Sequence, residues 1–231
     1  MTECAPVSVA VDVLVFTVQA EELKILLVHR SQPPFEGQWA VPGGFLGETE
    51  SAGETARRKL REKTGVQNVH LEQLYTFSRV DRDPRKRVLS VSYLAAVPGR
   101  LLMDRREEQS KLFTVSMDGT YTLHCDNCVL RDTDLAFDHG EMIRTAVSRM
   151  QGKLDYTDLA FSFLESVDAF SMTELYGVFC AVLGKNMDRS NFNRMIRNRY
   201  EMTGRLVRVG QKKSPRGRPA DLYRLREGKA I

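Results

Sequence analysis

The chain has 231 residues, of which 42% are apolar, 28% charged and 8% aromatic. This balance excludes collagen-like, low-complexity and disulfide-scaffold proteins, and the length allows one large domain or two smaller ones. The net charge of +4 conceals an asymmetry, because residues 1–184 carry 20 Lys and Arg against 26 Asp and Glu, whereas residues 185–231 carry 14 against 4. We therefore expect two domains, the second of which meets a phosphate-rich partner.

Two further features narrow the class of protein. No apolar run approaches the roughly 18 residues of a membrane span, and the N-terminus lacks a signal-peptide pattern, so we expect a cytoplasmic protein with no membrane partner. The four cysteines are too few for a disulfide framework. Cys125 and Cys128 form a CxxC motif, but no second pair follows at zinc-finger spacing, which favours free thiols in a strand or loop over a metal site.

The first half of the chain predicts β-strands around one helix. Strand-like runs, read from alternation and β-branched residues, form two hairpins and lie at residues 7–16 with 23–28, and at 73–79 with 88–97. A charged turn at 81–86 separates the strands of the second hairpin. Between the hairpins, glycines at 43 and 44 precede a helix expected over residues 52–64, with Gly65 as its C-cap.

The region from Leu101 to Thr133 is less regular, and we expect an additional hairpin with strands near 112–115 and 121–123 around a turn at 117–120. A helix follows over residues 140–150, with Asp138 as its N-cap. His139 lies beside the start of this helix, where a lone histidine is more often a structural hydrogen-bonding group than a catalytic one.

The second half predicts a winged helix-turn-helix, with the domain boundary at Gly152–Lys153 and hence domains of 1–152 and 153–231. A short helix is expected over 155–164. Ser171 and Glu174 match a capping box for a helix over 172–183, and Asp188 caps a third helix that reaches Tyr200. A helix, a short glycine turn and a basic helix form the helix-turn-helix pattern.

A basic wing should complete this domain. Strands expected over 205–209 and 222–225 flank a loop that carries four cations between residues 211 and 220. Such a loop suits a narrow minor groove, while the polar face of the third helix suits the major groove. The residues that we predict to contact DNA are Arg189, Ser190, Asn191, Asn193, Arg194, Arg197, Lys212, Lys213, Arg216 and Arg218. Protein contact or RNA binding is the alternative use of such a module.

The segment from Gly44 to Val66 resembles the box of the Nudix family, in which a glycine, five residues, a glutamate and seven residues precede Arg-Glu-apolar-x-Glu-Glu-x-Gly-apolar. The spacing is kept, but Lys59 and Lys63 replace two of the three clustered glutamates. Positions i and i+4 share a helix face, and Mg²⁺ requires anionic oxygen ligands. The pattern therefore predicts no catalytic residues, no metal and no cofactor. The plain alternative is that this charged helix is only a solvated surface helix.

Motifs along nearly the whole chain resemble the Nudix-related transcriptional regulators, the NrtR family. These motifs are the damaged box, Leu-Ala-Phe-Asp-His at 135–139, Gly-Lys-Leu-Asp-Tyr-Thr at 152–157, Asn-Phe-Asn-Arg at 191–194 and Gly-Arg-Pro-Ala at 217–220. The resemblance implies a mixed-sheet α/β/α sandwich followed by a winged helix. It also implies a bacterial regulator, typically a repressor, that binds a palindromic DNA operator as a homodimer.

By the same resemblance, the first domain senses a small effector, either ADP-ribose or a sugar. We assign effector contact to Arg30, Trp39, Gly44, Phe45, Arg58, Lys59, Glu62 and Lys63. The alternative for Trp39 is a place in the core, because a lone tryptophan packs in the core more often than it contacts a ligand. The segment from Leu101 to Thr133 is longer than the usual connection in the family, so the resemblance does not decide which effector binds.

Two alternatives compete with this interpretation. In the first, the protein is an active Mg²⁺-dependent Nudix diphosphohydrolase of ADP-ribose or a related nucleotide sugar, with Glu50, Glu54 and Glu62 as metal ligands. In the second, the protein is a DNA-binding platform whose first domain binds no ligand. Two measurements distinguish these alternatives from the regulator. One is the release of product when the protein is incubated with a panel of nucleotides, and the other is a ligand-induced shift in melting temperature.

Overall fold

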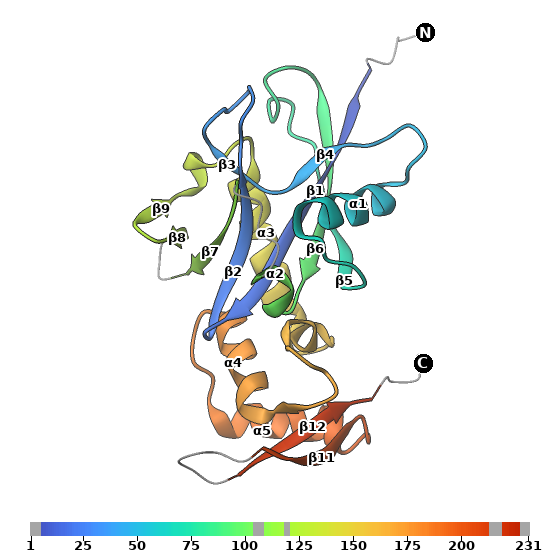
Figure 1. Cartoon of the computed structure of the whole chain (residues 1–231), viewed down its shortest axis with the longest axis vertical. Coiled ribbons are helices and arrows are strands. Elements are labelled where there is room, and N and C mark those ends of the chain that lie inside the picture. The colour runs from blue at the N-terminus through green and yellow to red at the C-terminus, as the bar shows by residue number, and fades with distance from the viewer. Residues whose placement is uncertain (1–5, 104–108, 118–120, 213–218, 227–231) are drawn as a thin grey trace.

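The computed structural model describes residues 6–103, 109–117, 121–212 and 219–226. Figure 1 shows a large α/β domain above a smaller unit of helices and a short sheet. This arrangement confirms the predicted fold class, a mixed-sheet α/β domain followed by a winged helix. Within the described part of the chain, no helix is long and apolar enough to cross a membrane.

The large domain is built on a sheet whose strands lie in the order β5-β6-β1-β2-β7-β8-β9. Their bounds are β1 (Ser8–Gln19), β2 (Glu22–His29), β5 (His70–Phe77), β6 (Val88–Ala96), β7 (Ser110–Ser116), β8 (Thr122–Cys125) and β9 (Cys128–Leu130). Both predicted hairpins are confirmed, because β1 pairs with β2 and β5 with β6 in antiparallel fashion. The parallel pairing of β1 with β6 makes the sheet mixed. Short strands β3 (Trp39–Ala40) and β4 (Gly43–Phe45) pair with β2 and β1.

Two helices cover opposite faces of this sheet. Val13 and Val15 of β1 share a buried cluster with Leu60 of α1 (Ala52–Thr64). Their neighbours Leu14 and Phe16 point to the other face and share a cluster with α3 (His139–Lys153). Because successive side chains of a strand alternate between faces, one apolar strand supplies both layers of the α/β/α sandwich.

The ends of α1 follow from local signals in the sequence. Ser51 and Glu54 form a capping box, and Gly65 ends the helix with a φ of +68°, where a side chain would add strain. Both the helix and its C-cap are therefore as predicted. At the start of α3, however, Asp138 occupies the N-cap position without a side-chain capping bond. The predicted N-cap position is thus confirmed, but the carboxylate makes no capping bond because it binds Arg82 instead.

The region from Leu101 to Thr133 contains the expected hairpin, which β7 and β8 form. Three elements were not predicted, namely the short helix α2 (Arg100–Met103), strand β9 and the 3₁₀ helix η1 (Asp132–Asp134). Part of the expected turn, at residues 118–120, lies outside the described residues. Cys125 and Cys128 lie in β8 and β9, which agrees with their predicted place in a strand or loop.

The segment after α3 differs from the prediction. Helix α3 continues to Lys153, so the expected boundary falls within its last turn. In place of a helix over 155–164 there is a turn followed by the 3₁₀ helix η2 (Leu159–Phe163). Two side chains account for this, because the Thr157 hydroxyl accepts a bond from the Leu159 N–H, and Asp158 binds Arg205 rather than capping a helix.

The smaller unit is a winged helix-turn-helix. Helix α4 (Met172–Leu183) begins at the predicted capping box of Ser171 and Glu174 and ends at Gly184. Helix α5 (Arg189–Ile196) is capped by Asp188 and continues as a π-helical turn, η3 (Arg197–Glu201). Strands β10 (Phe170–Ser171), β12 (Ala220–Leu225) and β11 (Leu206–Lys212) form its sheet. The predicted strands are thus confirmed, but they extend further into the wing than expected.

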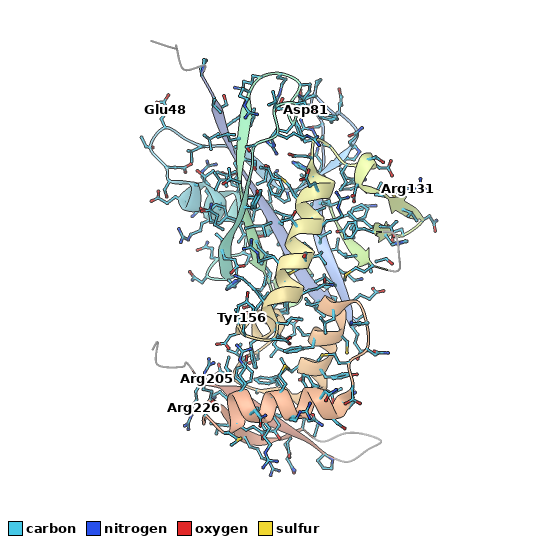
Figure 2. The ribbon with its side chains drawn as sticks, turned by 180° about the vertical axis from the view of Figure 1, so that it is seen from behind. Glu48, Asp81, Arg131, Tyr156, Arg205 and Arg226 are labelled. Atoms are coloured by element: carbon cyan, nitrogen blue, oxygen red, sulfur yellow. The ribbon has the colours of Figure 1, made fainter. Side chains whose placement is uncertain are left out.

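Helix α3 connects the two units. Figure 2 shows it in front of the sheet, running from near Asp81 to Tyr156 beside the winged helix. At its lower end, the Gln151 amide donates to the carbonyl oxygens of Val182 and Leu183 in α4. Met150 and Leu154 share one buried cluster with residues of α4. Helix α3 is therefore packed directly against the helix-turn-helix.

Candidate functional site

The charged side chains of α1 pair mostly with one another. The Arg58 guanidinium donates two bonds of 2.7 Å to the Glu50 carboxylate and one of 2.9 Å to Glu62. These bonds lower the pKa of Glu50 to about 2. Lys59 binds Glu62 at 2.9 Å, and Glu54 is held in the capping box. Glu50, Glu54 and Glu62 therefore each have a cation or a helix cap as a partner.

The two lysines that replace box glutamates lie toward the glycine turn of β4. A Cβ placed on Gly44 would lie 2.6 Å from Lys59 Cε, so Gly44 provides the space in which this lysine lies. Lys63, one turn further along α1, lines a cavity of about 250 Å³. The helix thus presents cations at the face where the family's box has carboxylates.

This cavity opens between β1, β4, α1, the loop that joins β5 to β6, and the start of α3. Four cations line it, Arg30, Lys63, Arg82 and Arg85, together with the carboxylates of Asp12 and Asp83. Asp83 accepts three bonds from Arg85, which lower the pKa of its carboxyl group. The excess of cations suits an anionic ligand.

A buried ion-pair network forms the floor of the cavity. Arg82 is only 4% exposed and binds both carboxylate oxygens of Asp138, at 2.9 and 2.7 Å. Asp12 lies 3.7 Å from the same guanidinium and accepts a bond from the Ser90 hydroxyl. Buried charges are tolerated only when they are paired in this way. The network joins β1 and the β5–β6 loop to the residue that precedes α3.

His139 completes this floor as a neutral acceptor. Its Nδ1 atom accepts a bond of 3.1 Å from the Val41 N–H. Burial lowers the pKa of His139, since the charged imidazolium would lose its hydration. This geometry supports the structural role predicted for this histidine.

Aromatic rings line the mouth of the cavity beside guanidinium groups. Arg30 lies over the ring of Phe137 at 4.9 Å and also donates to the carbonyl oxygens of Pro34 and Gln32. Phe45 is 43% exposed and is covered by Lys86 at 4.5 Å. Flat rings of this kind can stack on a nucleobase or on the face of a sugar as well as on the neighbouring cations.

The residues predicted to contact an effector fall into three groups. Arg30, Gly44, Phe45 and Lys63 line the cavity. Arg58, Lys59 and Glu62 lie beside it on α1, in the ion pairs described above. Trp39 packs against His29 and Phe113 at the edge of the core, which is the place that a lone tryptophan usually takes.

Sequence reasoning missed Asp12, Arg82, Asp83, Arg85 and Phe137 as cavity residues. Four of these are charged and lie in segments that read as a strand or a polar turn. The only signal was the 135–139 motif, in which Phe137 stands directly before Asp138 with a φ of +56°. A positive φ is uncommon for a bulky residue. It persists only where the surrounding contacts keep the backbone in this strained conformation.

The second predicted surface lies on α5. Phe192, Ile196 and Tyr200 are buried, and the predicted contacts on this helix are all exposed, namely Arg189, Ser190, Asn191, Asn193, Arg194 and Arg197. Arg189 stacks on the ring of Tyr176 at 3.8 Å, and the Tyr176 hydroxyl donates to the Met187 carbonyl oxygen at 2.7 Å. Lys212 is exposed at the end of β11, whereas Lys213, Arg216 and Arg218 lie outside the described residues.

Comparisons with known proteins match both halves of the chain. The NUDIX domain family matches residues 8–122, and the NrtR DNA-binding winged helix domain matches residues 161–225. The chain is 32% identical over 217 residues to the ADPR responsive transcriptional repressor NtrR of Acinetobacter baylyi, covering 93% of this chain and 80% of the relative.

Solved structures give the same result. NrtR of Shewanella oneidensis in complex with a 27mer DNA matches with a TM-score of 0.76 and 33% identity, over 94% of this chain and 93% of that one. A MutT/nudix family protein of Enterococcus faecalis matches with a TM-score of 0.79 and 31% identity, over 98% and 89% of the two chains.

A Nudix domain joined to a DNA-binding winged helix defines a class of protein, the transcriptional regulators that carry a Nudix-type sensor. In this class the first domain meets the effector and the second meets DNA. The chain belongs to the NrtR family of Nudix-related transcriptional regulators.

Proposed function

We propose that this protein is a repressor that releases its DNA operator when the cavity of the Nudix domain binds ADP-ribose or a related nucleotide sugar. The relative from Acinetobacter baylyi bears a name that describes a response to ADPR. The observation that carries the proposal here is the replacement of box carboxylates by Lys59 and Lys63 beside a cation-rich cavity. The protein would act where its DNA is, in the bacterial cytoplasm.

A diphosphate fits this arrangement without a metal. Lys63 lines the cavity and Lys59 adds charge at the glycine turn, whereas the Arg85 guanidinium is bound to the Asp83 carboxylate. Ammonium and guanidinium groups supply the charge and the hydrogen bonds that a phosphate needs. The Arg58 guanidinium is already engaged by Glu50 and Glu62, so we infer that it holds α1's carboxylates rather than the ligand.

The donor set does not fit the Mg²⁺ of a Nudix hydrolase. Mg²⁺ requires anionic oxygen ligands, whereas Glu50, Glu54 and Glu62 are bound to Arg58, Ser51 and Lys59. Within the described residues, no three His, Cys, Asp or Glu side chains converge as a metal site. We therefore propose that the protein binds the nucleotide sugar and does not hydrolyse it.

The DNA-binding half of the proposal rests on the exposed face of α5. Its Arg and Asn side chains match the groups that read guanine and adenine in the major groove, with Lys212 and the wing on the adjacent backbone. We propose that two copies bind a palindromic operator, one half-site each. Because several cations contact phosphates, affinity should fall steeply as salt rises.

Coupling between the two sites would pass through α3. This helix begins at the buried His139, which lines the cavity, and ends against α4, about 22 Å away for its 15 residues. A dimer on two half-sites tolerates little change in the spacing of its recognition helices. A ligand that moves the cavity floor would thus alter that spacing and weaken the complex with DNA.

The direct test is fluorescence anisotropy with the DNA upstream of the protein's own gene. We expect binding at moderate salt and its reversal by ADP-ribose, and a flat salt response or a complex indifferent to every nucleotide sugar would contradict the proposal. A parallel assay of AMP release with Mg²⁺ tests the hydrolase alternative. Turnover of about 1 per second or more would identify an enzyme instead.

A further inference from the structure

A pair of cysteines closes the hairpin at the edge of the large sheet. Strands β8 and β9 are joined by the two-residue loop Asp126–Asn127, and Cys125 and Cys128 are directly opposite each other across the strands. Facing residues of an antiparallel pair lie on the same side of the ribbon with Cα atoms about 4.5–5.5 Å apart. This separation is within the range that a disulfide spans, about 4.4–6.8 Å.

The two thiols have different surroundings. Cys125 packs against the core, and its Sγ lies 3.6 Å from a carboxylate oxygen of Asp126. Burial and this carboxylate raise the pKa of Cys125. Cys128 is exposed, and Figure 2 shows that Arg131, just after β9, lies at the lateral edge of the molecule. An oxidant in solution therefore reaches Cys128 first.

We propose that Cys125 and Cys128 form a reversible thiol–disulfide pair that low-molecular-weight disulfides oxidise. The Cys128 thiolate attacks one sulfur of the oxidant and forms a mixed disulfide, releasing one small thiolate. Cys125 loses its proton and attacks the Cys128 sulfur, which expels the second small thiolate and closes the bond. Two protein thiols are oxidised, one small disulfide is reduced to two thiols, and the electrons balance.

The position of the pair makes this bond readily reducible and places it in a hairpin that leads to the cavity. An exposed bond across neighbouring strands is reduced more readily than a buried structural disulfide. Leu123 and Leu130 anchor the hairpin to the core, and η1 then leads to Asp138 at the cavity floor. Oxidation would fix the hairpin that precedes this segment. The inference rests on the β8–β9 register and the exposure of Cys128, and it does not depend on the identity of the effector.

The test uses full-length protein in glutathione buffers, with alkylation, trypsin digestion and mass spectrometry. Cleavage after Lys111 and Arg131 yields a peptide that contains Cys125 and Cys128 and no other cysteine. We expect this peptide to lose two hydrogens with no bound glutathione, and to regain them in dithiothreitol. At equal glutathione disulfide, its oxidised fraction should exceed the glutathione adduct at Cys180 by about tenfold, because the second step is intramolecular.

Two variants separate a pair from independent thiols. Cys125→Ser should leave a stable glutathione adduct on Cys128, whereas the matched control Cys180→Ser should oxidise at 125 and 128 as the parent does. The proposal fails if both cysteines of the parent peptide carry separate glutathione adducts. It also fails if both remain reduced under conditions in which Cys180 reacts.

Discussion

Helix α1 and the loop between β5 and β6 contribute cations to the same cavity, but they hold their charges differently. On α1, Arg58 is 30% exposed and pairs with Glu50 and Glu62, both within eight residues of it. In the loop, Arg82 is buried and pairs with Asp138, 56 residues away. Surface pairs contribute little to stability, whereas a buried pair becomes very costly when one partner is removed. The same residue type therefore supplies surface charge on α1 and stabilises the fold in the loop.

Arg82→Ala should have the largest effect, because it leaves the Asp138 carboxylate buried without its partner. We expect the free energy of unfolding to fall by about 3–5 kcal/mol in urea denaturation. Arg58→Ala, the matched change on α1, should lower the free energy of unfolding much less, because water screens its ion pairs at the surface. Equal losses in the two variants would contradict this difference between α1 and the loop.

Lys59→Glu combined with Lys63→Glu should change how the cavity binds its ligand. The two substitutions restore the carboxylates of the box, so the helix face becomes a binder of hard divalent cations. We expect calorimetry to show Mn²⁺ or Mg²⁺ binding and a loss of ADP-ribose affinity in EDTA of at least about tenfold, or about 1.4 kcal/mol. Arg57→Glu with Arg61→Glu, exposed on the same helix, is the control and should leave that affinity within a few-fold. An unchanged affinity in the double Lys variant would show that these lysines do not contact the ligand.

His139 should make stability depend on pH. Its pKa is lowered in the folded state, so the unfolded chain takes up a proton as the pH falls below about 6.5 while the folded protein does not. The contribution of His139 to the free energy of unfolding is therefore complete above that pH. It decreases below that pH, by no more than about 1.4 kcal/mol for each pH unit. His139→Gln should lose this part of the pH dependence between pH 7 and 5.5 in urea denaturation. Parallel curves for the two proteins would contradict the neutral, buried imidazole.

Tyr176 should have the smallest effect, because it acts on DNA binding through Arg189. Its ring supports the guanidinium at 3.8 Å, and stacking of this kind contributes about 0.5–1 kcal/mol at exposed sites. Tyr176→Leu should weaken operator binding by about two- to fivefold in anisotropy titrations, whereas Tyr176→Phe keeps the ring and should retain nearly full affinity. A loss of equal size in both variants would assign the effect to the hydroxyl and its bond to Met187.

The sequence predicted best those elements whose signals are local. The capping box at Ser171, the glycine that ends α1 and the alternation in β1 each lie within a few residues of the element that they define. The charge asymmetry and the apolar spacing of α5 likewise predicted the exposed basic face.

Several cavity residues were not predicted, because their places in the cavity depend on contacts between residues that are distant in sequence. Asp138 reads as an N-cap, and only the fold shows that Arg82 lies close enough to take its carboxylate. The helix expected over 155–164 failed for a similar reason, since Arg205 binds Asp158 from 47 residues away. Local propensity cannot report such partners.

The central claim is that cations of the protein replace the metal of a Nudix hydrolase in binding the effector. It is tested most directly by calorimetric titration of ADP-ribose into the full-length protein, once in EDTA and once in Mg²⁺. The account predicts binding with the same affinity, within about twofold, in both buffers. Binding that occurs only in Mg²⁺ would contradict it.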